Sequence, residues 1–455
     1  MEPNRGSVPS SPAEAPAPTS PGPRRRPRKW LRRIGKGLVF LLGLVLVLAA
    51  ASGLWLRSKL RASLPELEGE RRVEGLAAPA TVERDAAGIP TIQGASRRDV
   101  AFAEGYVHAQ DRLFQMDLMR RQSAGELAEL FGPGVVQADR DVRVHRFRAR
   151  AARLLQESPP QVREILEAYA QGVNAGRASL GGDPFEYLAM RAKPSPWRAE
   201  DSFLVLFSMF MQLNDEEGMT ERTLSQLREA VPPALFEFLT PQGTAWDSPL
   251  VGDRLPSPPV PGPQVCNVPA RPAPAAEPKA ASLTPPAPRE VPGSNGWVVA
   301  GSHTADGGAL LANELHLGLM VPNLWYRVSL SWPDGAGGRH RVTGVTLPGA
   351  PAMVLGSNGR VAWGVTNSAI DTTDLITLEV DPARPDTYRT PEGPRRFERH
   401  REVIRVKGGE EEAVDVDSTV WGPVSGKDWK GRPQVLRWTA YEPGAADFQI
   451  LGLET

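Results

Sequence analysis

The sequence predicts an α+β protein in which a mostly helical region precedes a mostly β region. In the first half, apolar residues recur at spacings near three and four, the period of a helix that buries one face. After residue 294 the apolar runs are short and are bounded by turn-forming residues, which is typical of strands. A Pro- and Ala-rich segment, residues 256–292, lies between the two regions and cannot bury enough apolar surface to order itself.

Composition limits the kind of partner that the chain can have. Basic and acidic residues balance at 53 each, so the charge gives no indication of a nucleic-acid partner. At 455 residues the chain can bury one large core or two. The one cysteine, Cys266, lies in the low-complexity segment, so an intrachain disulfide is excluded and the redox compartment stays open.

The N-terminus predicts a membrane anchor. Residues 1–36 are Pro-rich and then basic, and we expect a disordered cytoplasmic tail there. Residues 37–56 carry no charge, and about 20 such residues are enough to cross a bilayer as a helix. The basic flank should stay cytoplasmic, which leaves the rest of the chain periplasmic or extracellular. Small residues at 49–52 keep open the alternative of a cleaved signal peptide.

Residues 57–255 form the first folded region. It starts with an expected stalk, followed by two short strands around a turn, at residues 57–76, 81–84 and 89–92. Helical periodicity then covers three stretches, at residues 96–131, 142–177 and 201–213. The first of these stretches is ended by the Gly-Pro-Gly sequence at 132–134.

The region from residue 294 onward is predicted to be mostly β. Its strand candidates are residues 297–300, 309–312, 325–330, 341–346, 352–355, 361–365, 375–380 and 403–406. The sequence Gly-Ser-Asn-Gly at 356–359 separates two of these candidates and predicts a hairpin turn.

Ser294 lies at the junction between the low-complexity segment and the first expected strand. If the Gly293–Ser294 peptide bond is cut, Ser294 gains a free α-amine, so that one residue carries both a hydroxyl nucleophile and a base. An α-amine titrates near ~8, so a useful fraction is neutral at pH 7. An ordinary turn is the alternative, because the Gly-Ser-Asn-Gly tetrapeptide that contains Ser294, residues 293–296, recurs at 356–359.

Several sequence blocks in the same order resemble the penicillin acylase family of N-terminal-nucleophile hydrolases. These blocks are residues 105–117, 294–299, 310–318, 325–326, 344–349 and 358–364. The resemblance runs from about residue 64 to the end and implies a four-layer αββα sandwich with the nucleophile at the start of a central strand. It also implies that residues 256–293 are an excised spacer and that 57–255 and 294–455 become two subunits of a heterodimer. The alternative for the spacer is a plain interdomain linker, and the resemblance further implies that the C-terminal part of the fold is absent.

The same resemblance implies the roles of individual residues. Ser294 matches the nucleophile, Gly293 the residue before the cut, and His316 a position near the nucleophile's amine. The backbone N–H of Asn367 matches an oxyanion donor, and a second donor is expected beyond Thr455. Polar residues on the first long helix, namely His108, Gln110 and Asp111, are therefore expected to be structural.

A calcium site and an acyl pocket are further implications. Asp371, the Thr373 carbonyl and Asp374 match the family's calcium loop, and Glu221 is expected to complete it, since Ca²⁺ takes six to eight oxygens. A solvated acidic turn is the alternative, and no organic cofactor is expected. The acyl pocket is predicted from four apolar side chains, those of Leu317, Leu355, Val365 and Phe210.

The favoured hypothesis is a membrane-anchored amidohydrolase that cuts itself and then cleaves a small-molecule amide between a hydrophobic acyl group and an amine. Penicillins, acyl-homoserine lactones and other N-acyl amides all suit such a pocket. The alternative from another class is a non-catalytic envelope protein that keeps the fold without processing. A Ser-His-Asp hydrolase is less favoured because no Gly-x-Ser-x-Gly sequence surrounds Ser294.

Overall fold

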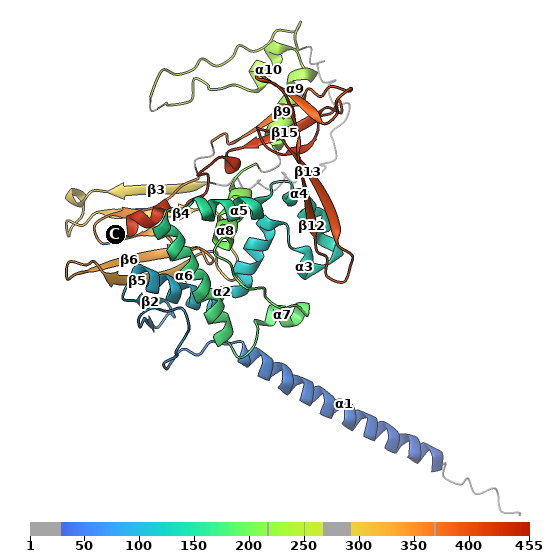
Figure 1. The fold of residues 1–455 in the computed structure, drawn as a ribbon, viewed down its shortest axis with the longest axis vertical. Helices are drawn as coiled ribbons and strands as arrows, with labels where there is room; N and C mark the ends of the chain where they lie inside the picture. The colour runs from blue at the N-terminus through green and yellow to red at the C-terminus, as the bar shows by residue number, and fades with distance from the viewer. Residues whose placement is uncertain (1–28, 216–217, 250, 267–292, 368–369) are drawn as a thin grey trace, which may run out of the picture. The chain divides into compact units, whose positions relative to one another are not determined.

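The computed structural model describes residues 29–455 apart from 216–217, 250, 267–292 and 368–369 (Figure 1). The chain divides into two compact units, Met1–Lys59 and Leu60–Thr455. Most of the expected spacer, residues 256–293, lies outside the described residues, and so does the tail before residue 29.

Helix α1 (Lys29–Ala62) contains the expected membrane span. It is long and apolar enough to cross a membrane by length and composition, a property that a signal sequence shares. The helix starts within the tail that was expected to be disordered and continues to Ala62, so the first residues of the expected stalk are helical. The uncharged stretch sets the length of a span, but helical propensity in the flanks decides where the helix ends.

Helices α2 (Arg97–Ala124) and α6 (Pro160–Ser179) form the centre of the first folded region. Ser96 caps α2 by accepting a hydrogen bond from the Asp99 N–H at 3.1 Å. The two helices approach so closely that a Cβ at Gly105 would lie 2.2 Å from the Tyr169 carbonyl oxygen. A Cβ at Gly172 would lie 1.9 Å from the Phe102 carbonyl oxygen, so glycine on both helices allows backbone-to-backbone contact.

Two of the three predicted helical stretches are divided in the structure. The first stretch is broken where Gly125 adopts φ 64°, which ends α2 before the short α3 (Ala128–Phe131). The second becomes α5 (Phe147–Glu157) and α6, because α5 cannot continue through Pro159 and Pro160, the second of which is the first residue of α6. The third coincides with α8 (Asp201–Leu213). The remaining helices are η1 (Pro133–Val135), α4 (Val136–Arg143), α7 (Phe185–Met190), α9 (Met219–Ala230) and α10 (Pro233–Leu239).

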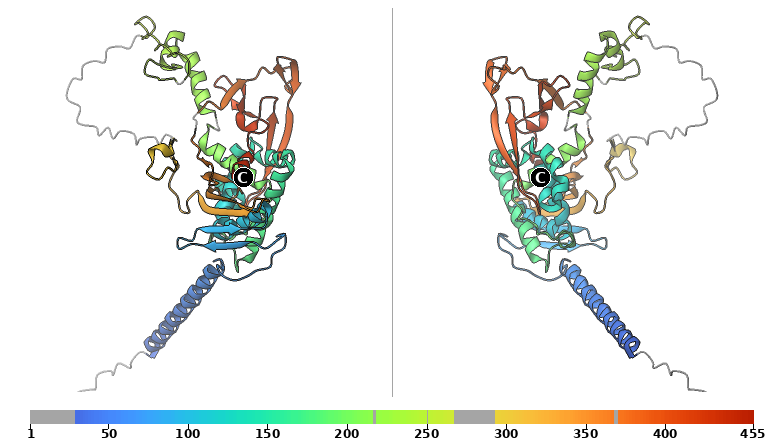
Figure 2. Two further views of the ribbon diagram at one scale, coloured as in Figure 1. Left: turned by 90° about the vertical axis from the view of Figure 1, so that its left-hand side faces the viewer. Right: turned by 90° about the vertical axis from the view of Figure 1, so that its right-hand side faces the viewer.

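A six-stranded sheet joins the regions before and after the low-complexity segment. Its strand order is β1-β2-β5-β6-β7-β8, with β1 (Thr81–Arg84), β2 (Pro90–Gln93), β5 (Tyr326–Pro333), β6 (Arg339–Thr346), β7 (Met353–Ser357) and β8 (Ala362–Trp363). Strand β2 pairs in parallel with β5, while the other pairs are antiparallel. Helix α2 lies beside this sheet (Figures 1 and 2). Apolar residues of α2 pack on the sheet through one buried cluster.

Strand β3 (Ser294–Val299) does not lie in this sheet. Among the described residues it pairs with β4 (Leu310–Leu315) alone, in register Ser294↔Leu315. Its apolar side chains stay open to solvent, with Trp297 59% and Val298 72% exposed. The expected central position of β3 is therefore not observed, and the described chain does not show a four-layer sandwich.

Smaller β units complete the part of the chain that follows. A three-stranded sheet has the order β14-β15-β9, and two hairpins are formed by β10–β11 and β12–β13. The bounds of these strands are Thr373–Thr377 (β9), Thr387–Thr390 (β10), Gly393–Arg396 (β11), Glu398–Ile404 (β12), Glu412–Ser418 (β13), Val424–Lys427 (β14) and Pro433–Trp438 (β15). Short helical turns lie at η2 (Gly301–His303), η3 (Thr439–Tyr441) and η4 (Gln449–Glu454).

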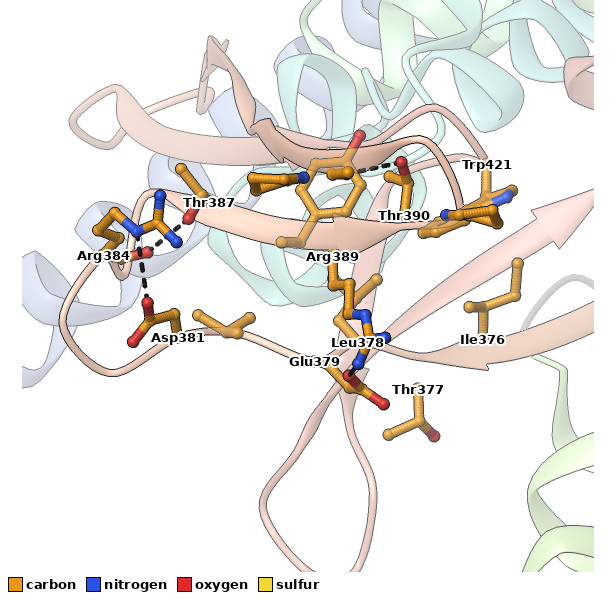
Figure 3. A pocket seen from close by; sticks show the side chains of 15 residues that line it. Ile376, Thr377, Leu378, Glu379, Asp381, Arg384, Thr387, Arg389, Thr390 and Trp421 are labelled. Carbon is orange, nitrogen blue, oxygen red and sulfur yellow. Dashed lines mark hydrogen bonds and ion pairs between the residues drawn. The ribbon is translucent and has the colours of Figure 1, made fainter.

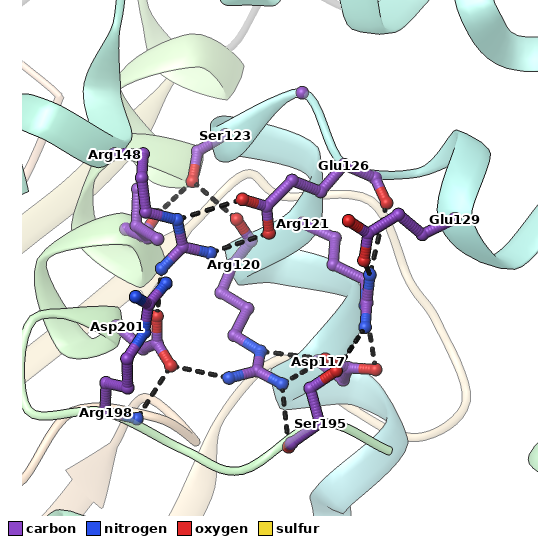
Figure 4. A network of polar contacts seen from close by, with 12 residues as sticks. Asp117, Arg120, Arg121, Ser123, Glu126, Glu129, Arg148, Ser195, Arg198 and Asp201 are labelled. Carbon is purple, nitrogen blue, oxygen red and sulfur yellow. Dashed lines mark hydrogen bonds and ion pairs between the residues drawn. The ribbon is translucent and has the colours of Figure 1, made fainter. Parts of the chain in front are cut away.

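A buried ionic network fixes α2 against the segment that leads into α8 (Figure 4). Arg120 lies 2.6 Å from Asp117 and 2.5 Å from Asp201, and each of these three side chains is at most 5% exposed. Arg121 contacts Asp117 at 3.0 Å, and Arg148 of α5 contacts Asp201 at 2.5 Å. Each buried charge thus has an opposite charge within contact distance, which is the condition for burying ions without a large penalty.

His108 has the structural role expected for it. Its Nδ1 lies 2.7 Å from the Tyr169 hydroxyl and its Nε2 lies 3.1 Å from Thr346 Oγ1, so the ring links α2, α6 and β6. Complete burial lowers the pKa of His108 to about 3, so the ring is neutral at pH 7. Gln110 and Asp111 are half-buried and hydrogen-bonded to neighbouring segments, as expected of residues that join segments of the fold.

Candidate active site

Ser294 is the first residue of β3, and its hydroxyl has two short contacts. The hydroxyl donates to the carbonyl oxygen of Gly293 at 2.6 Å, and the backbone N–H of Asn367 donates to Ser294 Oγ at 3.1 Å. The backbone N–H of His316 donates to the same Gly293 carbonyl at 3.1 Å. The structure therefore brings four of the predicted residues together, and the backbones of His316 and Asn367 make the contacts.

The side chain of His316 makes its hydrogen bonds elsewhere. Its Nε2 lies 3.1 Å from Glu314 Oε1 and 3.2 Å from Asn295 Nδ2, so the expected hydrogen bond between the ring and Ser294 is not formed among the described residues. Asn295 lies opposite Glu314 in the β3–β4 pair, while Ser294 lies opposite Leu315. Because side chains alternate between the faces of a strand pair, Asn295 and Glu314 share the face opposite to that of Ser294.

Glu314 was not predicted as a site residue. Its carboxylate accepts from Asn295 Nδ2 at 2.7 Å, and this hydrogen bond, followed by that of His316, lowers the pKa of Glu314 below its ordinary value. The signal that could have identified it was its place within the 310–318 block, from which His316 and Leu317 alone were selected.

Asn313 is a second residue that the sequence analysis missed. Its Nδ2 donates to the Asn295 carbonyl at 2.8 Å, and its Oδ1 accepts from the Val365 N–H at 3.0 Å. The side chain thus links the strand that carries Ser294 to the segment that carries Asn367. Asn367 is followed by residues 368–369, which are outside the described part of the chain.

The four predicted pocket residues line neither the cavity beside β9 and β10 nor the one beside residues 71–75 and 171–179. Leu317 and Phe210 are partly buried and pack against the main apolar core. Leu355 is half-buried in β7, opposite Val345 of β6, whereas Val365 is 39% exposed. The Phe210 ring centroid lies 6.4 Å from that of Trp438, an aromatic neighbour that the sequence analysis did not include.

The predicted calcium ligands have suitable chemistry, but the described residues include no group of three or more His, Cys, Asp or Glu side chains arranged for a metal ion. Burial, followed by the negative charges of Asp371 and Asp374, raises the pKa of Glu221 above its ordinary value. Asp371 Oδ1 accepts from the Thr373 N–H at 3.3 Å, which supports a tight acidic loop. The predicted carboxylates are thus within electrostatic reach of one another without forming a coordination shell.

A cavity of about 820 Å³ lies in another part of the β region (Figure 3). Side chains from β9, β10 and the segments beside them line it, including Tyr388 and Trp421. Two ion pairs lie at this cavity, Arg389–Glu379 at 2.9 Å and Arg384–Asp381 at 3.3 Å. None of the predicted site residues is among those that line it.

Comparison with known proteins connects the chain to one family. The model of the family described as penicillin amidase matches residues 79–453. The acyl-homoserine lactone acylase QuiP of Pseudomonas aeruginosa is 31% identical over 90% of this chain and 47% of its own length. The penicillin acylase 2 proenzyme of Pseudomonas sp. is 31% identical over 87% of this chain and 50% of its own length.

A solved structure, the thermostable penicillin G acylase from Alcaligenes faecalis, matches 39% of this chain and all of the matched chain. That match has 28% sequence identity and a TM-score of 0.33. The chain spans about half the length of the curated relatives that it matches.

Proposed function

The chain belongs to the penicillin amidase family, and from that membership we propose that it carries the nucleophile of a self-processing amidohydrolase. The substrate is a linear amide that joins a hydrophobic acyl group to an amine. Relatives named as acyl-homoserine lactone acylase and penicillin acylase support this class of reaction. Penicillins, acyl-homoserine lactones and other N-acyl amides are the candidate substrates.

The first proposed step is cleavage of the Gly293–Ser294 bond. Ser294 Oγ attacks the Gly293 carbonyl carbon, the hydroxyl proton passes to the departing amide nitrogen as the C–N bond breaks, and an ester joins Gly293 to the Ser294 oxygen. Water then hydrolyses the ester, which leaves a carboxylate on Gly293 and a free α-amine on Ser294. The 2.6 Å contact between Oγ and the carbonyl oxygen supports this step, as does the His316 N–H, which can stabilise the developing oxyanion.

The second proposed step is attack on the substrate. The freed α-amine takes the proton from the Ser294 hydroxyl through one water, since its pKa near ~8 leaves part of it neutral at pH 7. An acyl-enzyme forms as the amine product leaves with a proton, and water then releases the acid. The Asn367 N–H, 3.1 Å from Ser294 Oγ, is in range to donate to an oxyanion formed on a substrate carbonyl.

The acyl group is proposed to lie among Leu317, Leu355, Val365 and Phe210. These side chains offer apolar surface and no charge, so they favour an aliphatic or aryl acyl chain over a charged one.

Three further proposals concern assembly. Calcium would be held by Asp371, the Thr373 carbonyl, Asp374 and Glu221, where it would stabilise the acidic loop. Excision of a spacer ending at Gly293 would leave two subunits of one precursor as a heterodimer, which the proenzyme name of one relative supports. Helix α1 would anchor the protein in the cytoplasmic membrane with the catalytic part periplasmic or extracellular, or would serve as a signal sequence.

The observation that carries this proposal is that the backbone N–H groups of His316 and Asn367 meet at the Gly293–Ser294 bond, one on the Gly293 carbonyl and the other on Ser294 Oγ. An intact-mass measurement on the full-length protein tests it, because two cuts would release the spacer and leave two chains with masses that locate both cut sites. A single uncut chain without amidase activity would favour the alternative of a non-catalytic envelope protein.

A further inference from the structure

We propose that Asn313 is a positioning residue that holds the Asn367 N–H at hydrogen-bond distance from Ser294 Oγ. The proposal rests on the proposed role of Ser294, and it adds the residue that sets the spacing between nucleophile and oxyanion donor. Asn313 touches neither of these groups directly and acts through the backbone on both sides.

The first observation is that both the nitrogen and the oxygen of the Asn313 carboxamide form hydrogen bonds to the backbone. Nδ2 donates to the carbonyl of Asn295, the residue after Ser294, at 2.8 Å. Oδ1 accepts from the N–H of Val365, two residues before Asn367, at 3.0 Å. Because the donor and the acceptor belong to one planar group, the bridge fixes the distance between the two backbones.

The second observation is the lack of strand pairing where the bridge lies. Strand β8 ends at Trp363, and residues 364–367 are not part of a strand. Strands β3 and β8 belong to different sheets. The Asn313 carboxamide therefore links two segments that are not joined by the backbone hydrogen bonds of a shared sheet, and one of these segments carries Asn367.

A third observation comes from Gly364. A Cβ at this position would lie 2.7 Å from Asn313 Oδ1 and 3.0 Å from Asn313 Cβ. Any other residue at 364 would push the carboxamide away from Val365, although the backbone of Gly364 does not require a positive φ. The glycine is thus explained by the space that Asn313 occupies.

The test replaces Asn313 by Asp in the full-length protein. Asp keeps an acceptor for the Val365 N–H but presents an oxygen to the Asn295 carbonyl, which breaks half of the bridge. We expect slower self-cleavage and a fall of about 10- to 100-fold in kcat, because displacement of a catalytic group by about 1 Å can cost 100-fold. KM for a chromogenic acyl amide should stay within about twofold, since the lost interaction is made in the transition state.

Asn174 provides a matched control. Its carboxamide also donates to a backbone carbonyl and accepts from a backbone N–H, those of Trp197, at 2.8 and 2.9 Å, but in the helical region. Asn174→Asp should lower the yield or the thermal midpoint while kcat of the remaining enzyme stays at the wild-type value. If Asn313→Asp behaves in that way too, Asn313 has only a structural role and the proposal is overturned.

A double-mutant cycle with Gly364 gives an independent readout. Gly364→Ala should reduce kcat in the wild-type background and have a smaller effect when Asn313 is already Ala, because the carboxamide is gone and only the contact with the Cβ of residue 313 remains. Gly134→Ala, at a position with no atom within 4 Å of the added Cβ, serves as the control. Additive effects of Gly364→Ala and Asn313→Ala would overturn the proposal.

The Ser294→Ala variant distinguishes a failure of the positioning role of Asn313 from a failure of the proposed function. If an Asn313 variant stays uncut, its thermal midpoint is compared with that of uncut Ser294→Ala: similar midpoints support the positioning role, and a much lower midpoint contradicts it. If Ser294→Ala itself still cuts and hydrolyses amides, the proposed function fails. If Ser294→Ala is inactive while Asn313→Asp keeps wild-type kcat and self-cleavage, only the positioning role fails.

Discussion

The backbone N–H of Asn367 lies 3.1 Å from Ser294 Oγ, although 73 residues separate the two in the chain. Strand β3, which starts at Ser294, and the segment after β8, which carries Asn367, meet at this contact. An N–H donor fixed by the fold beside a hydroxyl is what acyl transfer requires, because the donor need not reorganise as charge develops.

Replacement of Arg120 tests the buried ionic network. In Arg120→Leu, the carboxylates of Asp117 and Asp201 lose one of their cationic partners while they stay buried. We expect a loss of about 3 to 5 kcal/mol in the free energy of unfolding, the usual cost of breaking a buried pair from one side. Arg396→Leu is the control, because its pair with Asp386 is exposed and should contribute at most about 1 kcal/mol. Denaturant unfolding measures both variants, and equal effects would contradict the role given to the network.

Buried His108 predicts a loss of stability in acid. Its pKa is lowered by burial to about 3, against an ordinary value of 6.5, so the unfolded state binds a proton more readily than the folded state. Stability from this residue is complete above pH 6.5 and decreases as the pH falls toward the folded-state pKa. At pH 5 the expected loss is about 2 kcal/mol, from ~1.4 kcal/mol for each pH unit below 6.5.

The variant His108→Gln isolates this effect, because an amide hydrogen-bonds but does not titrate in this range. Unfolding midpoints at pH 7 and pH 5 should fall more for the wild type than for the variant. A decrease of the same size in both proteins would show that other groups account for the acid sensitivity, such as His145, whose pKa burial lowers to about 4.

Some elements of the fold could be predicted from local sequence patterns. Others could not, because they depend on contacts between residues that are far apart in the chain. The apolar run at Asp201–Leu213 predicted α8, and the turn sequence at 356–359 predicted the β7–β8 hairpin. The parallel pairing of β2 with β5 was not predicted, because neither strand carries a signal for its partner. Exposed strands such as β12 were predicted poorly, since charged residues on the open face conceal their periodicity.

The candidate site, too, could be predicted only in part, because some of its contacts join residues that are far apart in the chain. Resemblance to a family identified Ser294 and Asn367, but the side chain of His316 lies on a face that only the β3–β4 register reveals. Asn313 was missed because its role depends on the approach of Val365, which is 52 residues away in the chain.

Removal of calcium tests the predicted metal loop. Chelation, or Asp374→Asn, should lower the yield of folded and cleaved protein while substrate preference stays unchanged, because the ion is proposed to be structural. Elemental analysis of the purified full-length protein provides the direct measurement. Protein that is cleaved and active without bound calcium would contradict the proposal.

Two charges in α1 test the membrane anchor. Leu44→Arg together with Leu46→Arg should release the protein from the membrane fraction or block its export, since each charge costs ~3 kcal/mol at the centre of a span. Leu44→Val with Leu46→Val keeps the stretch apolar and should fractionate as the wild type does. Unchanged membrane association of the double Arg variant would exclude a spanning helix.

The central claim is that Ser294 is both the processing and the catalytic nucleophile, and N-terminal sequencing of the downstream chain tests it most directly. Wild-type protein should give a downstream chain that begins at Ser294, and Ser294→Ala should give one uncut chain that does not hydrolyse a phenylacetyl or fatty-acyl amide. Ser294→Cys should retain self-cleavage, because a thiol also attacks acyl groups, but should hydrolyse amides poorly. A downstream chain that begins at any other residue, or a Ser294→Ala variant that is still cut and active, would contradict the account.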